Sequence, residues 1–205
     1  MPGYVDRALK FFDHPVPKRP QHAPHTWIEP VFRSNQQQKP TAVSSAAPLD
    51  PHGTTRVQAI NGTFMYYGRA CYPCILVALN EIASEQSKPT TDTMAKTDML
   101  MDYLHTYPNA TIRYHASDMV LKICSDAAYL LHPRARSCIA AHYHLGWLSD
   151  TTRVNGSVDV LFQTLKNVVG STTEAETGGV YTGARHGSAI FNTLTEMGHP
   201  QAISC

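Results

Sequence analysis

Charged side chains are scarce in this sequence, and long apolar runs are lacking. Asp, Glu, Lys and Arg make up 16% of the 205 residues, and the formal net charge is +1. This balance excludes the strong positive field typical of nucleic-acid-binding proteins, so any such binding would need a local patch. No apolar run approaches the roughly 20 residues of a transmembrane helix, and no N-terminal signal segment is visible. We therefore expect an intracellular protein, cytoplasmic or nuclear, without a membrane partner.

Cysteine is also sparse. The chain has five cysteines, an odd number, and without a secretion signal we expect no disulfide framework. Hydrophobic residues nevertheless make up 42% of the chain, which is enough for a real core. The length suits one compact domain or two small ones.

The N-terminal quarter combines a short helix with a proline-rich stretch. Val5, Leu9 and Phe12 recur at helical spacing, which predicts an amphipathic helix within residues 1–13. Eight of the 14 prolines lie between positions 14 and 55. Proline at this density predicts a linker or extended strap over residues 14–54.

Residues 55–107 are predicted to form a small helical module. Apolar periodicity indicates helices over residues 55–70 and 74–86, separated by a proline. A third helix is expected to follow, with Thr90 or Thr91 as its N-cap. Its apolar face is expected to carry Met94, Met101 and Leu104.

Strand patterns replace helical ones after position 108. Residues 111–116 alternate over a short stretch, and residues 118–126 form an apolar run typical of a buried central strand. Period-two alternation predicts two further strands, over residues 137–149 and 157–169. The expected core face of the first carries Ile139, Ala141, Tyr143 and Leu145, and one face of the second carries Val158, Val160 and Phe162.

The C-terminal part is predicted to be helical. A helical region begins at Ser171, and a last amphipathic helix carries Ile190, Leu194 and Met197 before Gly198 ends it. Strands followed by helices predict an α/β or α+β sheet with helices packed on it. Of the two we expect α+β, with a helical module before a three-stranded sheet and C-terminal helices.

Two carboxylates are candidates for a metal site. Asp126 ends the apolar run, and Ser171 with Glu174 has the S-x-x-E form of a capping box, in which Glu174 reaches back to Ser171. Glu176 lies about 200° round the helix from Glu174, free to point toward the sheet, where an unpaired carboxylate is costly. Carboxylates from a strand and a helix suit magnesium or manganese. Alternatively, both glutamates only favour the positive end of the helix dipole.

The motifs "SDAAYL", "PRARS" and "VVGSTTEAE", in this order, resemble the ribonuclease H domain of copia-type retrotransposon polyproteins. Upstream, "MPGYVDRALKFF" resembles the segment that leaves the reverse transcriptase palm. "INGTFMYYGRACYPCILVALNEIASEQSKPT" and "DYLHTYPNATIRYHASDM" resemble the helical connection between polymerase and ribonuclease H. The resemblance implies a palm or thumb end over residues 1–13, a linker over 14–54, a connection module over 55–107 and a truncated ribonuclease H-like domain over 108–205.

The resemblance also implies a chemistry. Ribonuclease H hydrolyses the RNA strand of RNA–DNA hybrids with two magnesium ions about 4 Å apart. Asp126 matches the first-strand aspartate of the family, and Glu176 matches the second glutamate of its E-A-E motif, which leaves Glu174 structural. In the family a third carboxylate follows a "GHPQ"-like stretch, whereas this sequence stops at Cys205, before the third and fourth acids.

We therefore expect a fragment of a transposable-element reverse transcriptase that is inactive as an isolated chain. Its expected partners are an RNA–DNA hybrid and the remainder of the polyprotein. Loss of the strands that flank the first one would leave an exposed sheet edge, which favours self-association. The rival functions are a non-catalytic nucleic-acid-binding protein and a purely structural remnant.

Three basic residues are candidate phosphate contacts. Arg134 and Arg136 lie after the first main strand, near the expected metal site, and Lys166 follows the last strand. The alternative is solvated surface charge.

Other motifs suggest further chemistry. Cys71 and Cys74 have the C-x-x-C spacing of thiol oxidoreductases, but between two helices we expect structural cysteines instead. His142 and His144 share a strand face and have a spacing that suits zinc, with His132 as a possible third ligand. The alternative is a half-exposed sheet face.

Three glycines weaken the helix that carries Glu176. Gly178, Gly179 and Gly183 each cost roughly 1 kcal/mol relative to alanine. Either they permit close packing on the sheet, or they mark a sequence without functional constraint.

Overall fold

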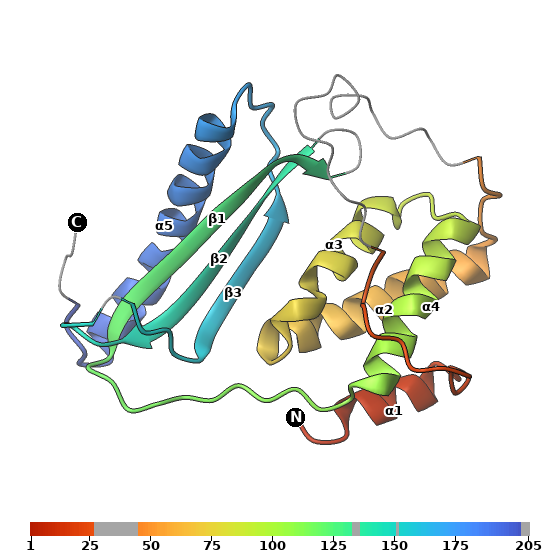
Figure 1. The fold of residues 1–205 in the computed structure, drawn as a ribbon, viewed down its shortest axis with the longest axis horizontal. Coiled ribbons are helices and arrows are strands. Elements are labelled where there is room, and N and C mark those ends of the chain that lie inside the picture. The colour runs from red at the N-terminus through yellow and green to blue at the C-terminus, as the bar shows by residue number, and fades with distance from the viewer. Residues whose placement is uncertain (27–44, 133–135, 151, 202–205) are drawn as a thin grey trace. The chain divides into compact units, whose positions relative to one another are not determined.

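The chain folds into two compact units that combine helices with a sheet, which confirms the α+β class (Figure 1). The first unit extends to Thr111, and the second begins at Ile112. Among the described helices, none is long and apolar enough to cross a membrane. The computed structural model describes residues 1–26, 45–132, 136–150 and 152–201.

The first unit is helical, and its helices lie where the periodicity predicts them. Their buried faces meet in an apolar core that includes Ile60, Phe64, Leu79 and Leu100, none of which is exposed to solvent. The helices are α1 (Tyr4–Phe11), α2 (Pro51–Ala70), α3 (Leu76–Glu85) and α4 (Thr91–Thr106), with a 3-10 turn at Pro73–Ile75.

Local capping explains where two of these helices begin. α2 starts four residues earlier than predicted, because the Asp50 side chain accepts a hydrogen bond from Gly53 N at 2.7 Å. α4 begins after Thr90, which forms a reciprocal capping box with Thr93. Of the apolar face predicted for α4, Met101 and Leu104 are buried and Met94 is half-buried.

The proline-rich stretch is described only in part. Residues 14–26 and 45–50 form no helix or strand, although Pro48 makes an isolated bridge with Thr90. The rest of the predicted linker, residues 27–44, lies outside the described residues.

The second unit holds an antiparallel sheet in the order β1-β2-β3. The strands are β1 (Val120–His132), β2 (Arg136–Gly146) and β3 (Ser157–Thr164). The expected three-stranded sheet is confirmed, but the prediction that the run at 118–126 forms a central strand is wrong. β1 lies at one edge of the described sheet, and β2 lies between its neighbours.

Residues 111–116 are not a strand, so that prediction is also wrong. They lie beside the segment before β3 and are held by side chains: Tyr114 Oη donates to Ser157 O at 2.9 Å, and His115 N donates to Asn155 Oδ1 at 2.8 Å. A Cβ at Gly156 would approach Arg113 O to 2.5 Å. The close approach of the two backbones there requires glycine.

β1 continues well past the predicted end at Asp126. Asp126 pairs with Ala140 in the middle of the ladder, and the register shifts only between Ala128 and His132. The small residues after Asp126 belong to the strand, where Ala127 pairs with Ile139. They let a helix approach, since a Cβ at Gly179 would lie 3.6 Å from Ala127 Cβ.

α5 (Thr172–Glu196) runs along one face of the sheet (Figure 1). The two predicted helical segments are one continuous helix. Its buried glycines face the sheet, where Tyr143 Oη donates to Gly183 O at 3.0 Å. The predicted core face of β2 is confirmed, because Ile139, Ala141 and Tyr143 are buried and Leu145 is half-buried.

A bulge changes the face predicted for β3. Val160 is buried and Phe162 is half-buried, as expected for one face. The register shifts where His144 pairs with Ser157, and Val158 instead lines a pocket against α5.

Candidate carboxylate site and nucleic-acid interface

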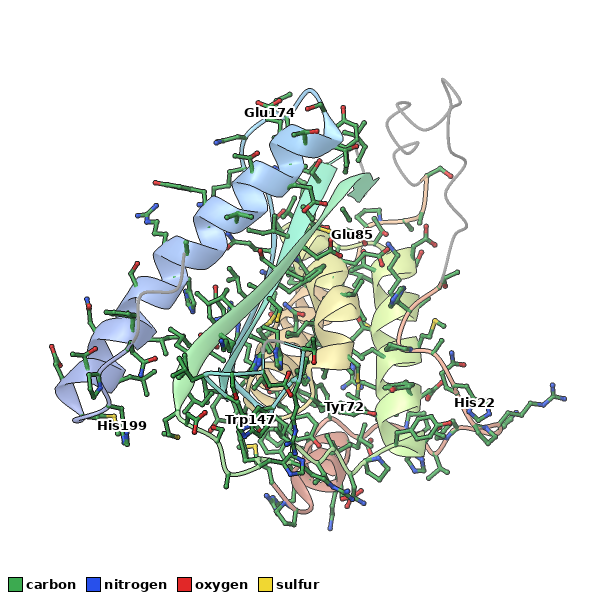
Figure 2. The ribbon with its side chains drawn as sticks, turned by 60° about the vertical axis from the view of Figure 1, so that its left-hand side comes forward. His22, Tyr72, Glu85, Trp147, Glu174 and His199 are labelled. Carbon is green, nitrogen blue, oxygen red and sulfur yellow. The ribbon has the colours of Figure 1, made fainter. Side chains whose placement is uncertain are left out.

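The N-terminus of α5 is capped by side chains. Ser171 Oγ accepts a hydrogen bond from Glu174 N at 3.1 Å, and Glu174 Oε2 accepts one from Gly170 N at 2.6 Å. Glu174 thus reaches one residue further back than the expected contact with Ser171. Figure 2 shows Glu174 at this end of α5 and His199 beyond the other end. Because Glu174 is engaged in the cap, Glu176 is the remaining candidate for a metal ligand near the start of α5.

Glu176 lies in the first turns of α5. It is half-buried and precedes Gly179 by three residues, so the two are neighbours on the helix surface. Gly179 faces Ala127 and Ile139. Glu176 therefore flanks the helix face that packs on β1 and β2.

Asp126 belongs to the opposite face of the same sheet. The side chains that meet α5 are those of its neighbours, because a Cβ at Gly183 would lie 3.5 Å from Ser125 Cβ, and one at Gly179 lies beside Ala127. Side chains alternate along a strand, so Asp126 points away from α5. It is exposed, and its Oδ1 accepts a hydrogen bond from Ala127 N at 2.9 Å.

The structure thus brings Asp126 and Glu176 to the same part of the sheet but not to the same face. In this arrangement the two carboxylates do not fit one shared magnesium ion, which needs oxygens converging at about 2.1 Å. Among the described residues, no group of three or more His, Cys, Asp or Glu side chains is arranged to hold a metal ion.

Two of the three basic candidates meet at one end of the sheet. Leu165 N donates to Ser137 O at 2.8 Å, which brings Lys166 and Arg136 to the same end, and both side chains are exposed. Gly178 faces Leu165, so the N-terminal part of α5 lies there too. Because Ser171 and the Glu174 carboxylate already cap this N-terminus, the positive charge at this end comes from Arg136 and Lys166. Arg134 lies outside the described residues.

His142 and His144 are neighbours on the face that also carries Asp126. Their ring centroids are 5.1 Å apart. Burial lowers the pKa of both imidazoles, and His144 is only 2% exposed with no partner at its Nδ1. Both rings are therefore neutral near pH 7. The side chain of His132, the suggested third zinc ligand, lies outside the described residues.

The C-x-x-C motif is not built for redox chemistry. Cys71 follows the last residue of α2, and Cys74 lies in the 3-10 turn rather than at the start of a helix after a strand. Burial raises the pKa of the Cys74 thiol. A redox-active cysteine needs a lowered pKa, because the thiolate is the nucleophile.

One side-chain contact in the second unit was not predicted from the sequence. Asp159 on β3 and His186 on α5 approach to 2.5 Å between Oδ2 and Nε2, and the His186 ring lies 5.1 Å from that of Tyr143. Burial, together with the charge of Asp159, raises the pKa of Tyr143 to about 12. The pair lines a pocket of about 370 Å³ with Leu145, Val158, Ala189, Ile190, Thr193 and Leu194. No local motif signals this contact, which depends on how α5 crosses the strands.

No protein-family model, no curated protein and no solved structure matches the chain.

Proposed function

We propose that the chain is part of a retrotransposon reverse transcriptase polyprotein, a helical connection module followed by a ribonuclease H-like half-domain. Its ancestral activity is two-metal hydrolysis of RNA in RNA–DNA hybrids, and the isolated chain cleaves little or nothing. The observation that carries the proposal is the ordered pair of motifs, S-D-A around Asp126 and S-T-T-E-A-E up to Glu176. A sheet with one helix packed along it is compatible with this origin.

The orientation of Asp126 supports the lack of activity. Two-metal hydrolysis needs a cluster of acids whose oxygens converge on both ions. Asp126 points away from α5, the helix that carries Glu176. Either acid alone is a weak ligand for a strongly hydrated magnesium ion.

Cleavage of a labelled RNA–DNA hybrid tests the proposal. The purified chain would be assayed with magnesium and then manganese, beside Asp126→Asn and Glu176→Gln variants. Glu196→Gln, at the exposed far end of α5, is the matched control. No cleavage by a chain that unfolds cooperatively is the expected result. Cleavage that both site variants lose and the control keeps would show a complete site and refute the claim of inactivity.

Non-catalytic binding of nucleic acid is a second candidate, favoured by the basic end of the sheet. Arg136 and Lys166 lie beside the N-terminal part of α5, where a phosphate backbone would find positive charge. Hybrid affinity would then fall as salt rises, and an Arg136→Glu/Lys166→Glu variant would show a smaller salt slope. Lys10→Glu, at an exposed position of α1, is the control. Binding that is indifferent to salt would exclude this function.

A further inference from the structure

Among the described residues, no strand pairs with β1 on the side away from β2. Leu121 N donates to Gln201 Oε1 at 2.7 Å, and Gln201 Nε2 donates to Met119 O at 3.1 Å. A side-chain amide here takes the place of backbone hydrogen bonds that a neighbouring strand would make to this edge. The N–H and C=O groups of this edge therefore point outward, where a further strand could bond to them.

The backbone N–H groups in the middle of this edge make no hydrogen bond to any described side chain. Outward and inward N–H groups alternate along a strand in an antiparallel pair, so Ile123, Ser125 and Ala127 point outward with Leu121. Ala127 N–H is satisfied by Asp126 Oδ1. Within the part of the chain that the structure describes, no side chain accepts from Ile123 N or Ser125 N. Both lie between Leu121 and Ala127, whose N–H groups donate to the side chains of Gln201 and Asp126.

We propose that two copies of this chain pair antiparallel along the β1 edge, about a two-fold axis through Cys124. In this register Ile123 of each copy exchanges backbone hydrogen bonds with Ser125 of the other. Lys122 of each copy faces Asp126 of the other. The inference goes beyond the proposed function and uses neither metal nor substrate, so it stands or falls separately.

Charge selects this register over its neighbours. Lys122, Cys124 and Asp126 share one face of β1, because side chains alternate. An axis through Cys124 therefore sets opposite charges across from each other twice, whereas parallel pairing or an axis through Lys122 would oppose like charges. An axis through Ile123 or Ser125 would leave both charges without an ionic partner. The symmetry of the charges about Cys124 is what identifies a second copy as the occupant.

The length of the regular ladder favours β1 over β3 as the pairing edge. β1 keeps an unbroken register with β2 from Val120 to Ala128, whereas β3 has eight residues and a bulge near its start. The central Ile123–Ser125 pairs use backbone groups that make no hydrogen bond to a described side chain, unlike those of Leu121 and Ala127. Extension to the Leu121–Ala127 pairs replaces the hydrogen bonds of Gln201 and Asp126 by those of the second copy.

A disulfide between the two copies of Cys124 would show directly that the strands pair in this register. It is a free, exposed cysteine whose own N–H points toward β2. On the proposed axis it forms a non-hydrogen-bonded pair with itself, and such pairs hold their Cα atoms about 4.5 Å apart. A disulfide accepts Cα separations of about 4.4–6.8 Å. Added diamide would take two electrons and two protons from the two thiols and link the copies.

Crosslinking and sedimentation of the full chain test the proposal. In a background with Cys71, Cys74, Cys138 and Cys205 replaced by alanine, diamide should yield a Cys124-linked dimer. Lys122→Asp or Asp126→Lys alone should raise the dimer dissociation constant on the order of tenfold, since each sets like charges opposite. The double variant should restore it. Gln201→Ala, which clears the edge, should strengthen association.

Two results would overturn the pairing. One is a chain that stays monomeric and uncrosslinked while hydrogen exchange shows Ile123 and Ser125 amides protected, because another segment then covers the edge. The other is a dimer that ignores both charge reversals, which would place the interface elsewhere. Cys124→Ser in the same background is the control for nonspecific crosslinks.

Discussion

At the scale of single residues, His144 makes the second unit sensitive to acid. Burial lowers the pKa of His142 and His144 in the folded chain, whereas the unfolded values lie near 6.5. A lowered folded pKa contributes stability above the unfolded value, and this stability is lost as the pH falls from about 6.5 toward the folded values. We therefore expect the free energy of unfolding of this unit to fall as the pH drops below about 6.5.

Urea unfolding of the Trp27→Phe chain measures this drop, because Trp147 then reports on the second unit. The Trp147 ring lies 4.1 Å from the Arg153 guanidinium carbon, within that unit. His144→Gln should reduce the change in the free energy of unfolding with pH, independently of its effect on stability at pH 7. His199→Gln, at an exposed position, should leave the slope unchanged. Equal slopes in the chain with and without His144 would refute the assignment.

The candidate site shows what the sequence can and cannot predict for a residue. The cap at Ser171 follows from a spacing of three residues, so it is visible locally. The face on which Asp126 lies depends on the parity of β1 relative to α5, and a shift of one residue would reverse it. Local sequence does not carry that parity. The Asp159–His186 contact is likewise a product of tertiary packing.

At the scale of elements, the glycines of α5 are not equivalent. A Cβ at Gly183 would meet Ser125 and Ala141 at 3.5 and 3.8 Å, which is ordinary contact. A Cβ at Gly187 would lie only 2.4 Å from Ile123 Cδ1 and 3.4 Å from Tyr143 Cε1. Close packing therefore accounts for glycine at 187, whereas alanine would fit at 183.

Alanine substitutions separate these cases. Gly183→Ala should raise the free energy of unfolding by about 1 kcal/mol, the gain in helix propensity. Gly187→Ala should gain less, because Ile123 must move. Ile123→Val removes the clashing Cδ1 and should recover part of the gain in a double-mutant cycle measured by urea unfolding. Gly62→Ala on α2, where a Cβ would have nothing within 4 Å, is the control. Equal gains at 183 and 187 would refute the packing difference.

Elements were easier to predict where one face meets a core. Periodicity located α1 to α4 and the alternation of β2, because each buries one continuous apolar face. Residues 111–116 alternate like a strand, yet their backbone is held by Tyr114 and by Asn155 instead of a ladder. The predicted strand ends at Asp126 because the apolar run stops there, whereas β1 continues through the small residues that follow, beside which α5 packs.

At the scale of the whole molecule, each unit has an apolar core of its own. Leu79 on α3 is fully buried in the first unit, and Ile139 on β2 is 1% exposed in the second. Ile139 belongs to a cluster with Ala141, Tyr143 and Leu161. Because each core consists of residues from one unit only, we expect a cavity in that core to destabilise that unit and not the other.

Truncation of one core residue in each unit tests this expectation. Leu79→Ala and Ile139→Ala should each cost about 2–5 kcal/mol, from lost burial and the cavity left behind. Hydrogen exchange read by peptide should show Leu79→Ala reducing protection in α2 to α4, and Ile139→Ala reducing it in β1 to β3. Val77→Ala, at a partly exposed position of α3, should change the free energy of unfolding by no more than about 0.5 kcal/mol. If either truncation reduces protection equally in both units, the two cores unfold as one cooperative structure.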